Sequence, residues 1–319
     1  MRPAPEPPMR LFLGAFLAVA CAHAAGGVAP ERMLKGTDTL GHRGDALLYS
    51  VSGISVDGHG NTYVTDILEY ALKKFDPRGR IVARAGRRGT APGEFRAPSL
   101  SAAGGGCVVV IQIEDPRIEI FDSALGFREE IRVSGGLPVD LARAGDAAFA
   151  VALCGDSARA DVLFFRPAHA GPVARLRLAP TGSTLPLYAA VRIAILPGGS
   201  LVAAYLFLNR VEIYSRAGIL LRRFSLALMP AGTAPPGDRH VPEETFFRKV
   251  MADGNGNIFL LGGNQSPHPG RDLFVCSPGG TLLRTLVLPV KPRTVALAPG
   301  ARLLATDESG TDVIAYNLR

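Results

Sequence analysis

The sequence contains no tryptophan, only 4 cysteines among 319 residues, and no apolar run of 20 residues. Without tryptophan the chain cannot carry the Trp-Asp dipeptide of WD repeats. Without a long apolar run it lacks the segments of a multi-span membrane protein. Charged residues make up 20% and hydrophobic residues 47%, so the chain is not disordered and can bury a large core. Its 37 glycines and 25 prolines follow no collagen-like period and indicate many short elements separated by turns.

The N-terminus, MRPAPEPPMRLFLGAFLAVACAHAAGG, has the pattern of a secretory signal peptide. Arg2 and Arg10 precede an apolar stretch, residues 11–21, that has about half the length needed to span a bilayer. Residues 22–24, Ala-His-Ala, form an A-x-A cleavage site. We therefore expect export, and we divide the chain into a signal peptide at 1–24, a linker at 25–30 and a single domain at 31–319.

A second processing route stays open, because residues 18–21, AVAC, are similar to the lipobox of bacterial lipoproteins, with Ala18 in place of the usual leucine. Cys21 would then become a lipid anchor. Both Met1 and Met9 are candidate starts, since Met9 followed by Arg10 would begin a compact signal. Removal of the signal takes away two arginines and one glutamate, so the net charge of +7 falls to +6. A processed protein with this charge would attract anionic polymers weakly. It has no run of Lys and Arg residues of the kind found in nucleic-acid-binding tails.

The cysteines that remain after processing are Cys107, Cys154 and Cys276. Their number is odd, they lack C-x-x-C spacing, and each lies in an apolar run typical of a strand. A zinc ribbon and a disulfide framework are both disfavoured, and we expect three buried small hydrophobes.

A turn followed by a short apolar strand recurs six times: GHGNTYVTD from Gly58, GGGCVVVIQ from Gly104, GDAAFAVAL from Gly145, GGSLVAAYL from Gly198, GNGNIFLLG from Gly254 and PGARLLATD from Pro299. Each turn also follows an apolar strand, so the unit is a hairpin. A second strand pair comes after each hairpin, with equivalent apolar positions at Phe75, Phe121, Phe165, Tyr214, Val275 and Tyr316. Four strands in a repeat of about 45 residues predict a blade of a β-propeller.

The last repeat ends at Arg319 without a fourth strand, and the segment around residues 33–36 has a strand without a hairpin. Pairing the two would protect two exposed sheet edges. The predicted fold is therefore all-β: a six-bladed β-propeller of four-stranded antiparallel blades, closed by an N-terminal strand that completes the last blade.

The first repeat, GISVDGHGNTYVTD with KKFDPRGRIVARAG and RRGTAPGEFRAP, resembles the NHL repeat of bacterial exported propellers. The fifth repeat carries the same features at Asp253, Gly256 and Asn257. Most of these residues have a structural role, because glycines such as Gly60 permit tight turns and the aromatic residues fill the space between blades. The resemblance thus implies a fold rather than a chemistry, and the sequence indicates no catalytic residue.

Functional residues of a propeller usually lie on the face formed by the second-to-third-strand loops and the blade-to-blade connections. Two long insertions, 229–249 and 262–272, reach this face around the fifth repeat. Long loops often carry function, so the candidate ligand-contacting residues are His240, Glu243, Glu244, Asn264, His268 and Arg271.

The same face offers two weaker metal-binding hypotheses. His42, His240 and His268 with carboxylates such as Asp66 and Asp307 would suit Zn²⁺. An acidic ring would suit Ca²⁺, with members Asp66, Glu114, Asp115, Asp156 and Asp307. No H-x-x-x-H or H-E-x-x-H spacing supports zinc, so solvated loop residues and strand caps are the favoured interpretation. The predicted fold requires no cofactor.

These observations favour a non-catalytic binding or scaffold module at the periplasm or cell surface, whose partner is a protein, a peptide or an anionic polymer. The alternative is a metal-dependent propeller enzyme that resembles lyases and lactonases such as the peptidyl-hydroxyglycine amidating lyase, which uses zinc-bound histidines. A third reading is RNA binding, as in other NHL domains, through a basic face of Arg87, Arg88, Arg96, Arg117 and Arg210. Export would remove the protein from RNA, so a nucleic-acid partner is disfavoured.

Overall fold

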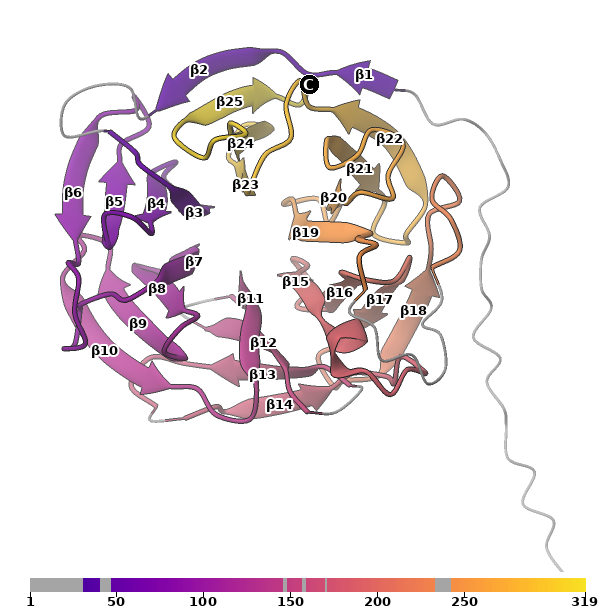
Figure 1. Cartoon of the computed structure of the whole chain (residues 1–319), viewed down its shortest axis with the longest axis horizontal. Helices are drawn as coiled ribbons and strands as arrows, with labels where there is room; N and C mark the ends of the chain where they lie inside the picture. Colours follow the sequence, from indigo (N-terminus) through magenta and orange to yellow (C-terminus); the bar gives the residue numbers. More distant parts are fainter. Residues whose placement is uncertain (1–30, 41–46, 146–147, 157–158, 170, 233–241) are drawn as a thin grey trace, which may run out of the picture.

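The structure is a computed structural model and describes residues 31–40, 47–145, 148–156, 159–169, 171–232 and 242–319. Six sheets stand around a central axis like the blades of a propeller (Figure 1). The predicted signal peptide, linker, Cys21, His42 and His240 lie outside these ranges. In the ranges themselves, no helix is long and apolar enough to cross a bilayer.

Each of the first three blades is a four-stranded antiparallel sheet whose strands follow one another in sequence. Blade 1 consists of β3 (Val51–Val56), β4 (Thr62–Asp66), β5 (Ala71–Phe75) and β6 (Ile81–Ala85). Blade 2 consists of β7 (Pro98–Gly104), β8 (Cys107–Gln112), β9 (Arg117–Asp122) and β10 (Phe127–Arg132). Blade 3 consists of β11 (Leu137–Arg143), β12 (Phe149–Cys154), β13 (Asp161–Phe165) and β14 (Ala174–Arg177).

The remaining blades include the two ends of the described chain. A 3-10 turn, η2 (Pro186–Ala189), leads into blade 4, which consists of β15 (Val191–Ile195), β16 (Leu201–Tyr205), β17 (Val211–Tyr214) and β18 (Leu220–Phe224). Blade 5 consists of β19 (Phe247–Ala252), β20 (Ile258–Gly262), β21 (Asp272–Cys276) and β22 (Leu282–Val287). Blade 6 consists of β23 (Val295–Ala298), β24 (Arg302–Thr306), β25 (Val313–Asn317) and the N-terminal β2 (Gly36–Leu40).

The N-terminal segment closes the ring, which confirms the predicted fold. β2 pairs antiparallel with β25, with Gly36 opposite Tyr316 and Leu40 opposite Val313. The closing strand therefore begins where the predicted segment, 33–36, ends. A second short strand, β1 (Glu31–Met33), pairs parallel with β22 as a fifth strand of blade 5. Between the two strands lies Leu34, which is buried among apolar residues of blades 5 and 6.

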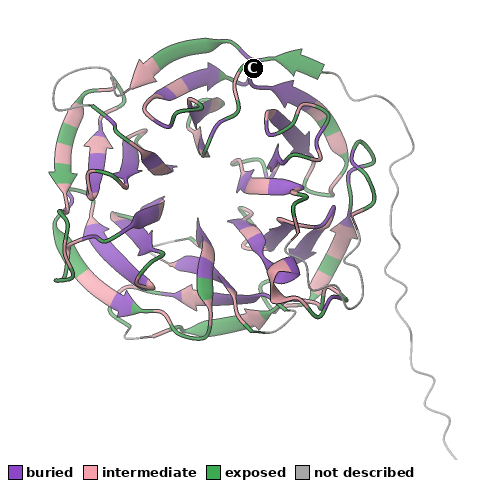
Figure 2. Cartoon of the chain, viewed as in Figure 1, coloured by how far each residue is buried: buried purple, intermediate pink, exposed green. Residues whose placement is uncertain are grey.

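The core lies between neighbouring blades. Figure 2 shows that burial is concentrated in the inner strands of each blade, whereas the outermost strands are largely exposed. The second strands β4, β16 and β20 are buried over their whole length. The equivalent apolar positions of the repeats are all at most 3% exposed: Phe75, Phe121, Phe165, Tyr214, Val275 and Tyr316. The repeat positions thus fill the space between blades, as the spacing predicted.

The three described cysteines form no disulfide. Cys276 is buried as predicted, but Cys107 and Cys154 are only partly buried. The prediction was wrong for these two because each begins or ends its strand near a loop, where the neighbouring blade does not fully cover it.

Candidate functional site

The two faces of the propeller differ in the loops that form them. The connection face consists of the loops between second and third strands together with the links between blades. The hairpin face consists of the turns between first and second strands and between third and fourth strands. The predicted candidates on the connection face that the structure describes belong to the loops of this face.

Asp66 and Asp307 hold loops on that face in place. Asp66 is fully buried at the end of β4, and its carboxylate accepts hydrogen bonds from the backbone N–H groups of Tyr49 (2.7 Å) and Ser50 (3.1 Å). Asp307 accepts from the N–H groups of Thr311 (2.8 Å) and Asp312 (2.9 Å). Burial alone would raise the pKa of Asp307, but the hydrogen bonds from Ser309 and these backbone groups outweigh it and lower the pKa. Both carboxylates therefore act as loop clamps.

The other members of the acidic ring do not gather around a common point. Asp115 pairs with the buried Arg117 (Nε to Oδ2, 3.0 Å), while Glu114 and Asp156 are exposed. Across the described part of the chain, no group of three or more His, Cys, Asp or Glu side chains is placed to hold a metal ion. The zinc hypothesis depends in part on His42 and His240, which lie outside that part.

The candidates of blade 5 contact the blade itself. Asn264 accepts a hydrogen bond from the N–H of Thr245 (2.6 Å) and donates to the carbonyl of Glu243 (2.8 Å). His268 Nδ1 lies 2.8 Å from Oδ1 of the buried Asp272. Asn264 and His268 thus shape the two insertions.

The remaining candidates of blade 5 are peripheral. Arg271 makes a long hydrogen bond to the carbonyl of Pro289 (3.4 Å), and Glu243 and Glu244 are exposed. The Nε2 atom of His268 faces the carboxylate of Glu31 in β1, at 3.6 Å, and so points to the outer edge of the ring. These side chains do not converge on the central axis.

Three of the five arginines considered for RNA binding are in ion pairs. Arg87 pairs with Glu94 (2.7 Å), Arg210 pairs with Glu212, and Arg117 is fully buried among carboxylates. Arg88 lies over the ring of Tyr70 at 5.5 Å, and Arg96 is exposed.

Arginines of the inner strands connect blades at the mouth of the central channel. Arg192 of β15 donates to the carbonyl of Val139 in blade 3 and, through Nε, to the carbonyl of Arg248 in blade 5 (3.1 Å). Arg248 of β19 donates to the carbonyl of Pro292 (2.9 Å), ahead of blade 6. Burial, and secondly the charge of Arg192, lower the pKa of Arg248. These hydrogen bonds between blades were not predicted from the sequence, although a basic residue inside an apolar inner strand can indicate such a contact.

An ion pair crosses the channel beside these arginines. Lys249 of blade 5 places Nζ 2.6 Å from Oδ1 of Asp140 in blade 3. The second carboxylate oxygen of Asp140 accepts a hydrogen bond from the N–H of Ile193 (2.8 Å), which belongs to the channel-facing edge of blade 4. Since an unpaired buried N–H is costly, Asp140 stabilises three blades at once.

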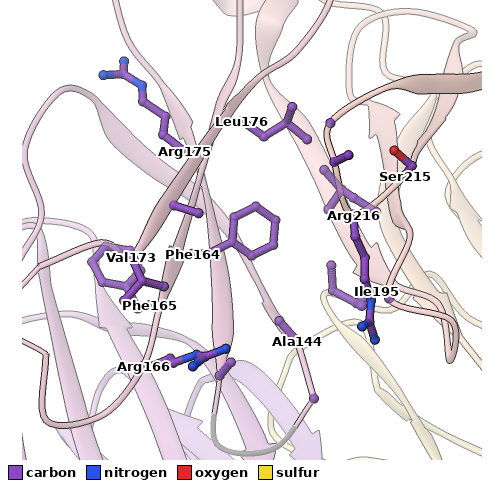
Figure 3. A pocket seen from close by; sticks show the side chains of 17 residues that line it. Ala144, Phe164, Phe165, Arg166, Val173, Arg175, Leu176, Ile195, Ser215 and Arg216 are labelled. Atoms are coloured by element: carbon purple, nitrogen blue, oxygen red, sulfur yellow. The ribbon is translucent and has the colours of Figure 1, made fainter.

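A cavity of ligand size lies on the opposite face. We call it the blade 3–4 groove: a hollow of about 680 Å³ between the hairpin turns of blades 3 and 4, with apolar walls that include Phe164, Leu176 and Ile195 (Figure 3). Ala144 lines one side of it, and Gly199 lies against the guanidinium group of Arg216, where an added Cβ atom would clash with that group. The volume is within the range of ligand pockets, about 300 to 1,000 Å³.

Three arginines line the groove, and two of them lack a partner. Arg175 forms an ion pair with Asp161. Arg166 and Arg216 are exposed, and neither has a carboxylate or hydrogen-bond partner for its guanidinium group within the described ranges. In Figure 3, these two side chains come from opposite walls, with their guanidinium groups toward the same end of the groove, whereas Arg175 points away. The groove therefore combines apolar walls with two uncompensated positive charges.

Comparisons with known proteins support the fold. No protein-family model and no curated protein matches the chain. A streptogramin B lyase structure is 12% identical, with 88% of this chain and 87% of that chain covered and a TM-score of 0.58. The calcium-binding protein regucalcin of Agrobacterium tumefaciens is 14% identical, with coverages of 91% and 96% and a TM-score of 0.57. Hydrazine synthase of Kuenenia stuttgartiensis is also 14% identical, with coverages of 83% and 82% and a TM-score of 0.56. The chain is a six-bladed β-propeller, similar in fold to these proteins.

Proposed function

We propose that this protein is an exported NHL-like β-propeller that serves as a non-catalytic binding or scaffold module at the cell envelope and takes an acidic partner in the blade 3–4 groove. The observation that carries the proposal is the pair Arg166 and Arg216, two unpaired cations beside apolar walls in a cavity of ligand size. Two like charges on opposite walls repel each other, so an anion placed between them gains from both.

The connection face supports binding over catalysis. Among its described candidates, Asp66 and Asn264 clamp loops, and the exposed Glu243 and Glu244 do not converge on a common centre. Groups that are already saturated with backbone contacts hold a scaffold rigid but have no free donor or acceptor for a reacting atom. A rigid scaffold with a separate groove is the arrangement of a binding module.

Binding is tested with an acidic peptide that has no free carboxyl terminus: C-amidated decaglutamate, labelled at its N-terminus and titrated with the full protein. Arg166→Ala with Arg216→Ala should abolish binding, and rising salt should weaken it, because exposed charges are screened. The control is Arg78→Ala, an exposed arginine in the equivalent hairpin of blade 1. Equal binding by the groove variant and the Arg78 control would contradict the proposal.

The alternative function is a metal-dependent enzyme of the lyase or lactonase type. Its support is the similarity in fold to streptogramin B lyase and to the calcium-binding protein regucalcin, which extends to the fold alone at these identities. Metal analysis of the protein purified without chelators separates the two functions. Stoichiometric Zn²⁺ or Ca²⁺ that disappears in His42→Ala or His240→Ala would favour the enzyme.

Export is tested by mass spectrometry of the mature N-terminus in a bacterial host. A chain that begins near Ala25 agrees with signal-peptide cleavage, and a lipidated Cys21 agrees with the lipoprotein route. A chain that retains Met1 or Met9 would show that neither takes place.

A further inference from the structure

The shape of the blade 3–4 groove restricts the kind of acid that fits it. In Figure 3 the two unpaired guanidinium groups lie toward one end, Phe164 and Ile195 lie between them or next to them, and Leu176 lies toward the other end. A polyanion can place only one or two of its carboxylates between the arginines and must keep the others in water, because burial of an unpaired charge against the apolar walls is costly. The groove therefore suits a single acidic group next to an apolar body.

The groove is also open along the hairpin face, because it lies between turns that carry exposed residues such as Arg166, Val173 and Arg216 rather than inside a blade. A bare acyl chain in it would keep much of its apolar surface in water. A peptide would bury its last side chain and leave its more polar backbone outside.

We propose that the blade 3–4 groove binds the carboxyl terminus of a peptide or protein whose last residue is apolar. Arg166 and Arg216 hold the terminal carboxylate from opposite walls, and Phe164, Leu176 and Ile195 contact the last side chain. Arginine suits this role because its planar group offers paired N–H donors to a carboxylate. This inference rests on the proposed function, since it names the class of acidic partner for the same groove.

The alternatives among cavities are less suited. A second hollow of about 660 Å³ lies between blades 5 and 6, but its wall carries Asp253, and Arg284 there donates to the carbonyl of Leu318 (2.9 Å). Arg284 is thus already paired, and a carboxylate lies in the same wall. The hollow has a similar size on the same face, and Arg319 also lines it, but the carboxylate of Asp253 in its wall would oppose an acidic ligand.

The test uses an N-terminally labelled peptide, Gly-Ser-Gly-Ala-Leu, with a free carboxyl terminus. Its C-amidated form and a form ending in serine are the matched probes, and decanoate is the acyl-chain probe. The free, leucine-ended peptide should bind the full protein at least about tenfold more tightly than the amide, since charge-assisted hydrogen bonds to the carboxylate are lost in the amide. Decanoate should displace the labelled leucine-ended peptide only weakly.

The protein variants separate charge from geometry. The substitutions Arg216→Ala and Arg166→Ala should each lower the affinity for the free peptide by about tenfold to a hundredfold. The weak affinity for the amidated peptide should not change. Arg216→Lys should recover only part of the affinity because an ammonium group lacks the paired donors. Arg78→Ala should match the unmodified protein, and all variants should keep its melting temperature because the three arginines are exposed.

The outcomes distinguish this inference from the proposed function. If amidated and free peptides bind equally while amidated decaglutamate still depends on Arg166 and Arg216, the terminal-carboxylate inference is wrong and the acidic-partner proposal stands. If decanoate binds more tightly than the peptide, the occupant is an acyl chain and the inference is wrong. If neither peptide nor decaglutamate depends on the arginines, both proposals fail.

Discussion

Lys249 and Asp140 are 109 residues apart in sequence and belong to blades 5 and 3, yet Nζ of Lys249 lies 2.6 Å from Oδ1 of Asp140. Blade 4 lies between them, and its N–H of Ile193 donates to the same carboxylate. Asp140 is 1% exposed, so its charge has little contact with water. One carboxylate thus stabilises the contact among three consecutive blades at the channel.

Replacing Asp140 with alanine should lower the free energy of unfolding by about 3 to 5 kcal/mol, because the Lys249 ammonium and the Ile193 N–H would both lose their partner. The measurement is chemical denaturation. The double substitution Asp140→Leu with Lys249→Met should lower the free energy of unfolding less than Asp140→Ala alone, since it leaves no unpaired buried charge. Arg128→Ala, which removes a surface ion pair with Asp122, should cost less than about 1 kcal/mol. A loss at Asp140 no larger than at Arg128 would show that the channel ion pair is not a structural tie.

Glu119 of β9 should make stability depend on pH. Burial, opposed by hydrogen bonding to the Gly93 N–H and by the charge of Arg117, raises the pKa of Glu119 from 4.5 to about 7. The folded protein therefore keeps a proton that the unfolded chain loses between these values. The stabilising contribution is complete below pH 4.5 and is lost as pH rises through about 7, at about 1 kcal/mol per pH unit within that window.

Thermal melts of the protein and of Glu119→Gln between pH 4.5 and 8 measure this contribution. The unmodified protein should lose stability relative to the variant as pH increases, because glutamine cannot ionise. A constant difference between the two across this range would contradict the raised pKa of Glu119.

Deleting residues 1–40 should lower the melting temperature and cause aggregation, because it removes β2 and exposes the edge of β25. Deleting residues 1–33 removes β1 but leaves Leu34 and β2 in place, so its effect should be smaller. Scanning calorimetry and light scattering compare the two truncated proteins with the full chain. Unchanged stability after the longer deletion would rule out closure of the ring by β2.

Gly60 has a φ of +82° in the first hairpin of blade 1, a conformation that a side chain disfavours. Gly60→Val should therefore destabilise the protein by about 1 to 3 kcal/mol through backbone strain. Gly58 in the same turn has no positive φ, and a Cβ atom there would meet no atom within 4 Å. Gly58→Ala is thus the control and should be near neutral. Equal effects at both positions would mean that φ is not the cause.

Much of the blade structure could be predicted from local patterns. Asp57, Gly60 and Asn61 form a turn in which Asp57 accepts hydrogen bonds from the N–H groups of His59 and Asn61 at 2.9 Å each, so the turn chemistry is contained in five residues. Phe75 and Phe121 are one blade length apart in the sequence, so they occupy the same position in neighbouring blades, and both are buried. Such features depend on neighbours along the chain.

The roles of individual polar residues could not be predicted in this way. Asp66 was a candidate metal ligand because it ends a strand on the connection face, yet its carboxylate clamps the backbone of Tyr49 and Ser50. His268 was a candidate for the same face, yet it contacts Asp272 and faces Glu31 of the N-terminal strand. The partner of each side chain depends on how loops from different repeats come together.

The sequence by itself determined the six repeats, their hairpins and the need for a closing strand, because hydrophobic alternation and turn residues act over a few positions. Only the tertiary structure decided that closure is shared between β1 and β2, that Lys249 meets Asp140 across the channel, and that two unpaired arginines flank a groove between blades 3 and 4. These features arise from the stacking of blades around a ring, which brings together side chains from different repeats that no local pattern relates.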